Sequence, residues 1–338
     1  MSIRTAVKIV LCSTLLAAAS LAAEPTATLR LASDVWPPFT DVEGKARVAI
    51  DLVHEALRRG GVEASSQVRP AFGDILDELR SGALDGSAGL WFSPERDAFL
   101  LFSEPYLENR LVLVGLKGSD IGATSLSELA DKRVAVVATY AYGESVEKAK
   151  APRFVEGKSD GENLQSLLRG EVDYVLADEL LVHHLFARYT EKAQRLLQVG
   201  SRPLVVRSLH FAVRRDYPDA AAIVAGFNKE IRRMIADGSY NRTLQMDWIQ
   251  ADVDGDGKLD LILGGREAGT EPPTRGYEVL TFKERVAGVV DGAQVSYFIA
   301  GQKYDDWEKV PPEYKIPGRT ALEPGMETGR PGIVLFEF

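Results

Sequence analysis

The chain has 338 residues, of which 45% are hydrophobic and 26% are charged; this is the composition of a soluble globular protein with two or three domains. Its formal net charge of -9 argues against a nucleic-acid partner and against docking on anionic lipid.

Residues 1–23 are predicted to form a cleavable signal peptide. Arg4 and Lys8 give a positive start, and an apolar run and a cluster of small residues follow. The apolar run is too short to span a membrane as a helix. The single cysteine, Cys12, lies in this segment, so the mature chain has no disulfide or cysteine-based metal site. We therefore expect export, to the periplasm in a Gram-negative source.

After the signal peptide, strand and helix patterns alternate in two similar sets. The first set is a strand at 28–33 and helices at 49–59 and 72–80, followed by a strand at 111–116. The second set comprises helices at 126–129, 144–149 and 161–168 and strands at 133–138 and 172–177, followed by a strand at 209–214 and helices at 220–237 and 240–248. This alternation indicates an α/β fold with parallel strands.

Two such halves predict two lobes that are hinged around a cleft. We expect lobe 1 to comprise residues 24–115 and 205–249, and lobe 2 to comprise residues 116–204. The tail, residues 250–338, has dense glycine and proline and a few alternating runs, at 277–282, 294–299 and 333–338. It predicts a small β-rich appendage.

Two segments, the one before Arg96 and the one after Val137, lie where ligands of open α/β sheets bind, outside the carboxyl ends of strands. Arg96 follows the small-residue and aromatic run that begins at Gly82, and its rigid fork of donors matches a carboxylate. A solvated surface turn is the alternative for Arg96. Asp178 follows the strand at 172–177, and the residues alone indicate an N-cap of the next helix, for which aspartate is preferred.

Aromatic residues near the same strand ends are candidates for the walls of a pocket. Clefts are often lined by aromatic side chains, but each of these residues is also a candidate for the core. They are Trp36, Phe39, Phe72, Trp91, Tyr140 and Tyr142.

The order of these segments resembles the family 3 extracellular solute-binding proteins, which bind polar amino acids for ABC importers. The resemblance runs from about residue 27 to residue 248. It is carried by the following pieces: Trp36-Pro37-Pro38-Phe39, Ile50-Asp51-Leu52, Gly82-Ala83-Leu84-Asp85, Pro94-Glu95-Arg96, Phe102-Ser103-Glu104-Pro105-Tyr106, Gly170-Glu171-Val172-Asp173, Ala177-Asp178 and Ala236-Asp237-Gly238-Ser239-Tyr240.

The resemblance implies roles for three of the candidate residues. Arg96 would clamp the α-carboxylate of the ligand, Asp178 would take its α-ammonium group, and Phe72 would cover its side chain. The chain departs from the family pattern at two of the candidate positions. Trp91 stands where a small hydroxyl or a backbone donor is usual, and Tyr140 lies in a segment that is usually of glycine-threonine-threonine type.

A calcium-like loop begins the tail. Carboxylates at its positions 1, 3, 5 and 9 and glycine at position 6 match the spacing of a calcium loop. The residues predicted to bind the ion are Asp252, Asp254, Asp256, Asp260 and, through its backbone carbonyl, Lys258. The glutamate that closes an EF-hand at position 12 is missing, and an acidic turn without an ion is the alternative.

The sequence therefore predicts a monomeric periplasmic binding protein that captures a small polar, amino-acid-like or carboxylate ligand. Its partner would be a membrane permease of the ABC type or a sensor. We expect no catalytic residues and no cofactor other than calcium. The alternatives are a dehydratase of the cyclohexadienyl or prephenate type on the same fold and a sensory or scaffold module that uses the tail.

Overall fold

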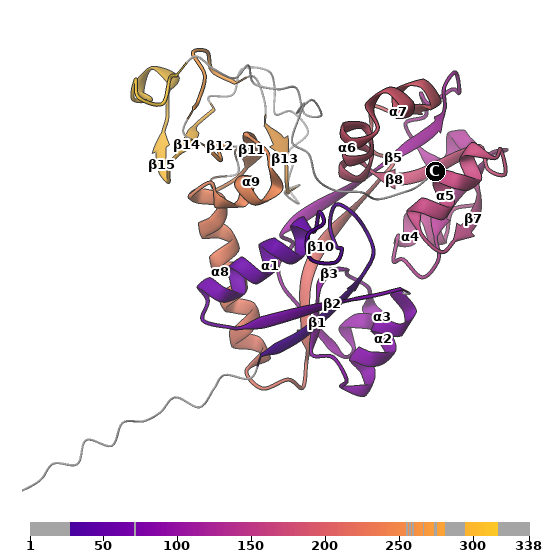
Figure 1. Cartoon of the computed structure of the whole chain (residues 1–338), viewed down its shortest axis with the longest axis horizontal. Helices are drawn as coiled ribbons and strands as arrows, with labels where there is room; N and C mark the ends of the chain where they lie inside the picture. Colours follow the sequence, from indigo (N-terminus) through magenta and orange to yellow (C-terminus); the bar gives the residue numbers. More distant parts are fainter. Residues whose placement is uncertain are drawn as a thin grey trace, which may run out of the picture.

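The computed structural model describes residues 28–316, apart from residues 71, 255, 257, 259, 266, 274–275 and 281–294. The predicted signal peptide and the predicted strand at 333–338 lie outside the described residues. The described chain forms two α/β lobes and an additional β-sheet near the C-terminus (Figure 1). None of the described helices is long and apolar enough to cross a membrane.

The first lobe is built on three parallel strands with helices packed against them. Strand β1 lies between β2 and β3, and β3 pairs in antiparallel fashion with β10. Every third or fourth residue of α1 is buried, which explains why its amphipathic pattern predicted a helix. The elements are β1 (Leu29–Asp34), α1 (Val48–Arg59), β2 (Ala64–Arg69), α2 (Phe72–Ser81), β3 (Gly86–Trp91), α3 (Pro94–Asp97) and β4 (Leu100–Phe102).

The long strand β5 (Leu107–Leu116) runs through both lobes, and the long strand β10 (Val205–Arg214) begins beside its midpoint. The first half of β5 pairs with β10, from Leu107 to Leu111, and the second half pairs with β8, from Leu111 to Gly115. The change of partner at Leu111 marks the hinge between the lobes. Because β5 is shared by the two lobes, the exact division of the chain at residues 115 and 205 stays a prediction.

The second lobe continues the same ten-stranded sheet in the order β5-β8-β6-β7. Its strands β6, β7 and β8 are parallel, as the strand-helix alternation predicted. The elements are η1 (Leu126–Leu129), β6 (Arg133–Val137), α4 (Glu144–Glu147), β7 (Arg153–Gly157), α5 (Asp160–Leu168), β8 (Tyr174–Asp178), α6 (Glu179–Arg188), α7 (Thr190–Leu196) and β9 (Leu197–Val199).

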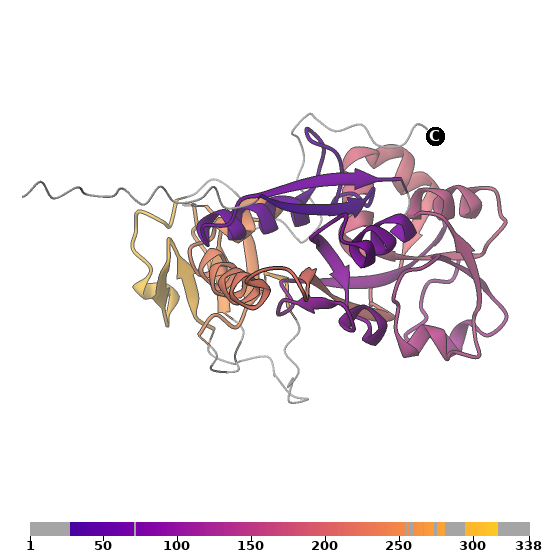
Figure 2. The same ribbon diagram turned by 90° about the horizontal axis from the view of Figure 1, so that it is seen from below.

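The chain returns through α8 (Ala220–Ala236), which packs on α1, and α9 (Ser239–Leu244). The helix expected at 240–248 ends early, because Gln245 takes a left-handed conformation and the next strand begins at Trp248. Figure 2 shows the resulting row of three parts, with the first lobe between the second lobe and the C-terminal sheet.

The C-terminal sheet, which we call the extension, has the strand order β13-β11-β12-β14-β15. Its own core is aromatic, with Trp307 5.2 Å from Tyr297 and 6.4 Å from Trp248 between ring centroids. The strands expected at 277–282 and 294–299 are present but shorter. The elements are β11 (Trp248–Ala251), β12 (Asp260–Leu263), β13 (Tyr277–Glu278), β14 (Tyr297–Ile299), β15 (Gln302–Tyr304) and η2 (Trp307–Lys309).

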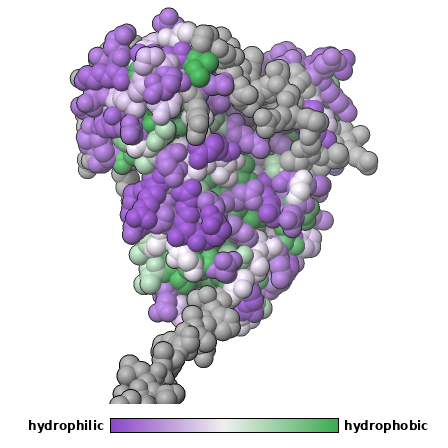
Figure 3. Space-filling model, turned by 60° about the vertical axis from the view of Figure 1, so that its left-hand side comes forward, coloured by the Kyte–Doolittle hydropathy of each residue, from purple (hydrophilic) through white to green (hydrophobic). Residues whose placement is uncertain are grey.

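The outer surface on the side of α8 and the extension is mixed in polarity. Hydrophilic residues form a broad band across this face, and the hydrophobic areas between them are small (Figure 3). The large apolar side chains of the described chain are mostly in the interior, where one continuous cluster connects both lobes to the first strands of the extension. The extension is therefore packed onto the lobes through apolar side chains.

Candidate functional site

Arg96 is buried at the junction of the two lobes. It lies on the short helix α3, whose N-cap Ser93 accepts a hydrogen bond from the Arg96 backbone N–H. The guanidinium donates to the carbonyl oxygen of Trp91 in lobe 1 (2.8 Å) and to that of Thr139 in lobe 2 (3.2 Å). It also lies over the Phe72 ring, 4.9 Å from the ring centroid. The surface-turn alternative for Arg96 is wrong, because only 5% of the residue is exposed.

Two features of this site are unusual: the backbone conformation of Thr139 and the buried positive charge of Arg96. Thr139 has a φ of 67°, a left-handed conformation that is uncommon for residues other than glycine, and in it the Thr139 carbonyl oxygen accepts from Arg96. Burial, and then the positive charge of Arg207, lower the pKa of Arg96 to about 10. The guanidinium is therefore still cationic at neutral pH, and its charge is poorly compensated.

A chain of hydrogen bonds connects Trp91 to Asp178. The Trp91 indole N–H donates to Asn109 Oδ1 (2.7 Å), and Asn109 Nδ2 donates to Asp178 Oδ2 (3.0 Å). The other carboxylate oxygen of Asp178 accepts a hydrogen bond from the Leu180 N–H (2.7 Å). Asp178 is therefore the N-cap of α6, which is the alternative role that the sequence offered for this residue. Burial raises the pKa of Asp178 to about 7.

Two further carboxylates, Asp34 and Asp160, lie in the same region. The Tyr140 hydroxyl, from lobe 2, donates to Asp34 Oδ2 at the end of β1 in lobe 1 (2.9 Å). Burial raises the pKa of Asp34, and burial and then the charge of Asp34 raise the pKa of Asp160 to about 7. An approaching cation would favour the ionised form of these acids.

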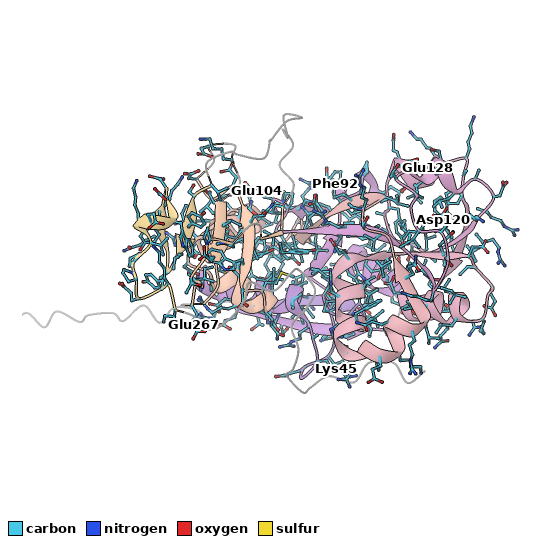
Figure 4. All side chains as sticks on the ribbon, turned by 90° about the horizontal axis from the view of Figure 1, so that it is seen from above. Lys45, Phe92, Glu104, Asp120, Glu128 and Glu267 are labelled. Carbon is cyan, nitrogen blue, oxygen red and sulfur yellow. The ribbon has the colours of Figure 1, made fainter. Side chains whose placement is uncertain are left out.

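The six aromatic candidates form one cluster that fills the space between the lobes. Tyr140 is in edge contact with Trp36, Phe72 and Trp91, at centroid distances of 5.7, 5.7 and 5.4 Å. Phe39 stacks on Trp36 at 4.3 Å and is fully buried, and the Tyr142 hydroxyl accepts from the Val137 N–H at 2.8 Å. By contrast, Phe92, the neighbour of Trp91, is 41% exposed on the surface (Figure 4).

All eight candidates from the sequence therefore lie in one contiguous set. Their role in ligand binding stays a prediction. Sequence reasoning did not select Asp34, Asn109, Asp160 or Arg207. A polar residue inside the apolar run 204–213 was a usable signal for Arg207, and an acid at the end of the first strand, close to Trp36, was one for Asp34. Asn109 and Asp160 lie among polar neighbours that carry no such signal.

Arg207, on β10, touches both lobes. Its Nη2 donates to the Phe92 carbonyl oxygen in lobe 1 (2.8 Å). On the side of lobe 2 it packs against Gly143, where an added Cβ would lie 2.7 Å from Arg207 Nη1. Gly143 has a φ of 86° and no side chain, and both features allow this close approach.

The acidic loop at the start of the extension gathers some of the predicted metal ligands. Carboxylate oxygens of Asp252, Asp254 and Asp260 lie within 4.8 Å of one another. The carboxylate of Asp256 instead accepts from the Lys258 N–H (2.8 Å). The Lys303 ammonium pairs with Asp254, so a cationic group already lies at this loop.

The fold and this interlobe arrangement define a two-lobed binding protein. Residues 29–251 match the model of the bacterial extracellular solute-binding proteins, family 3, and the chain belongs to this family. The match ends where β11 of the extension ends.

Several proteins with known names or structures are similar to this chain. A protein of Escherichia coli (strain K12), provisionally named ABC transporter arginine-binding protein 2, is 25% identical over 250 residues, which is 72% of this chain and 99% of that protein. The structure of an ancestral arginine-binding protein bound to arginine is 26% identical, with a TM-score of 0.54 over 64% of this chain and 96% of that one. A histidine kinase sensor domain, 20% identical with a TM-score of 0.56 over 65% of this chain and 95% of that one, shares the fold.

Proposed function

We propose that this protein is a periplasmic binding protein that captures a cationic amino acid, with arginine as the first candidate, for an ABC importer. Relatives named for arginine support this choice of ligand. We further propose that the chain is exported by its N-terminal segment, acts as a monomer and delivers its ligand to a membrane permease.

The observation that carries the proposal is the pair of buried opposite charges, Arg96 and Asp178, which are 5% and 2% exposed. The α-carboxylate of the ligand would accept a hydrogen bond from Arg96 Nη2 in place of the Thr139 carbonyl oxygen. The α-ammonium group of the ligand would pair with the carboxylate of Asp178. An ion pair with bidentate geometry suits arginine better than lysine on the protein side.

The acidic residues near Arg96 are the basis for proposing a ligand with a cationic side chain. Asp34 and Asp160 add two buried carboxylates near the clamp, and burial raises the pKa of both, in Asp34 despite the opposing effects of Tyr140 and Arg96. A guanidinium placed between the lobes would supply a neutralising charge. It would displace the Tyr140 hydroxyl from Asp34, so the aromatic cluster must open when the ligand enters.

The ion pairs of two nearby acids, Glu104 and Glu179, argue against these two residues as the general acid of the dehydratase alternative. General acid catalysis needs an acid within reach of the clamped carboxylate. Glu104 is paired with Arg232 on the surface, and Glu179 is paired with Arg110 (3.1 Å). Neither contacts Arg96 in the described structure.

Isothermal titration of the exported protein with L-arginine, L-lysine, L-glutamate and prephenate tests the proposal. We expect L-arginine to bind and Arg96→Ala to weaken it by about 2–5 kcal/mol, the usual effect of removing one partner of a buried charge pair. Arg80→Ala is the matched control, because Arg80 also lies over a phenylalanine ring (5.0 Å from that of Phe99) but is exposed. Equal arginine affinity in wild type and Arg96→Ala would refute the clamp, and turnover of prephenate would favour the enzyme.

We also propose that the loop at residues 252–260 binds calcium. The three gathered carboxylates support this proposal. For the ion to bind, the Lys303 ammonium must leave Asp254, and Asp256 or the Lys258 carbonyl must complete the ligand set.

A further inference from the structure

A short segment of the extension contacts the shared strand β5. Strand β13 pairs in parallel with β11, and Ile249 is opposite Tyr277. Just beyond β13, the Val279 carbonyl oxygen accepts from the Glu108 N–H at the start of β5 (2.8 Å). We call residues 277–279 the strap. Figure 1 shows β13 on the side of the extension that faces β5.

The strap is tightly packed. Tyr277 is 7% exposed and Val279 is fully buried, and both belong to the apolar cluster that connects the lobes. A Cβ on the preceding Gly276 would lie 2.4 Å from the backbone carbon of Ile249, so the chain approaches β11 at a distance that only glycine allows.

The Tyr277 side chain lies among groups that belong to the hinge and to lobe 2. Its hydroxyl is buried and has no hydrogen-bond partner among the described residues. Burial, and then the charges of Asp178 and Glu179, raise the pKa of Tyr277. Asp178 is paired with Leu111 of β5, and Glu179 forms its ion pair with Arg110 of β5.

These groups belong to different parts of the fold. Asp178 and Glu179 lie in β8 and α6 of lobe 2, whereas Tyr277 is held by the pairing of β13 with β11. An opening at the hinge would therefore move Asp178 and Glu179 away from Tyr277.

We propose that the extension is coupled to lobe closure through Tyr277, so that a ligand that closes the lobes also holds the strap in place. This inference rests on the proposed ligand-driven closure. Because coupling between two sites is reciprocal, a partner that holds the extension in this position would also tighten ligand binding. The extension is then the part of the protein that reports whether the lobes are closed.

The first test compares two buried tyrosines of the extension. Tyr277 and Tyr297 are 7% and 8% exposed, but Tyr297 packs against Trp307 and Trp248, in the extension's own core. We expect Tyr277→Ala to weaken L-arginine binding at least about 5-fold, the lower end of usual coupling between sites, and Tyr297→Ala to leave it unchanged. Equal affinities in the two variants overturn the proposal. Tyr277→Leu, which keeps more of the packing, gives the same comparison if Tyr277→Ala does not fold.

The second test needs no ligand, so it separates this proposal from the proposed function. Hydrogen exchange is measured at the backbone amides of residues 174–181 in wild type, Tyr277→Ala and Tyr297→Ala. Faster exchange in Tyr277→Ala alone supports the coupling, because lobe 2 then opens more often. Unchanged exchange in Tyr277→Ala overturns it. If wild type binds no amino acid, the proposed function fails and this second result still decides the coupling.

Discussion

Replacing Asp178 by asparagine should make the ligand-free protein more stable at pH 8 relative to pH 5. Burial raises the pKa of Asp178 from 3.8 to about 7, so the folded protein binds a proton at pH 5 that the unfolded chain has already released. A raised pKa gives stability at low pH that is lost as the pH rises through the folded value. Wild type should therefore lose the contribution of Asp178 between about pH 4 and pH 7.

The magnitude follows from the pKa of Asp178. Each pH unit between the unfolded and folded pKa values changes stability by about 1.4 kcal/mol per group, so wild type should lose about 3 kcal/mol between pH 5 and pH 8 through Asp178. The amide that replaces the carboxyl group in Asp178→Asn does not titrate. The variant would also lose the bond from Asn109 Nδ2, which is worth about 1 kcal/mol, but this loss applies equally at both pH values and cancels in the comparison.

The assay is urea unfolding at pH 5 and pH 8 on protein that was unfolded and refolded to remove any bound ligand. The free energy of unfolding of Asp178→Asn, relative to that of wild type, should be about 3 kcal/mol higher at pH 8 than at pH 5. Asp173→Asn is the control, because Arg133 lowers the pKa of that exposed acid and its contribution is constant over this range. A parallel pH dependence in wild type and Asp178→Asn would refute the buried, unneutralised state of Asp178.

Two further predictions concern the calcium loop and Gly143. Calcium should raise the melting temperature of wild type above its value in chelator and should leave that of Asp254→Asn unchanged. At a calcium concentration of about 100 times the dissociation constant, the gain in the free energy of unfolding is about 2.7 kcal/mol. Identical melting of wild type with calcium and with chelator would contradict the site. Gly143→Ala should destabilise the protein for two reasons. The positive φ of residue 143 costs alanine about 1–2 kcal/mol, and the clash of the new Cβ with Arg207 adds a further cost. Gly118→Ala, where φ is 90° and no atom lies within 4 Å of the added Cβ, isolates the backbone effect, and an equal loss in urea unfolding of both variants would disprove the Arg207 contact.

Local patterns were sufficient for most helices and for the apolar strands. The buried face of α1 and the apolar run of β6 repeat at helix and strand periods, so each element is visible within its own segment. Strands β2 and β3 were not predicted, because Ala64–Arg69 is largely polar and Gly86–Trp91 begins with small residues. Strands β5 and β10 begin earlier than expected, because polar residues near their starts, Glu108–Arg110 and Arg207–Ser208, interrupt the apolar pattern.

The sequence alone determined the family-like order of segments and the eight candidates for the site, because short motifs and strand ends are local properties. Only the tertiary structure brought Asp34 to Tyr140, which are 106 residues apart, and placed Asn109 between Trp91 and Asp178. The same is true of Tyr277, whose position against the hinge depends on the pairing of β13 with β11. Such contacts join segments that have no common periodicity, so they exist only after the lobes and the extension have packed together.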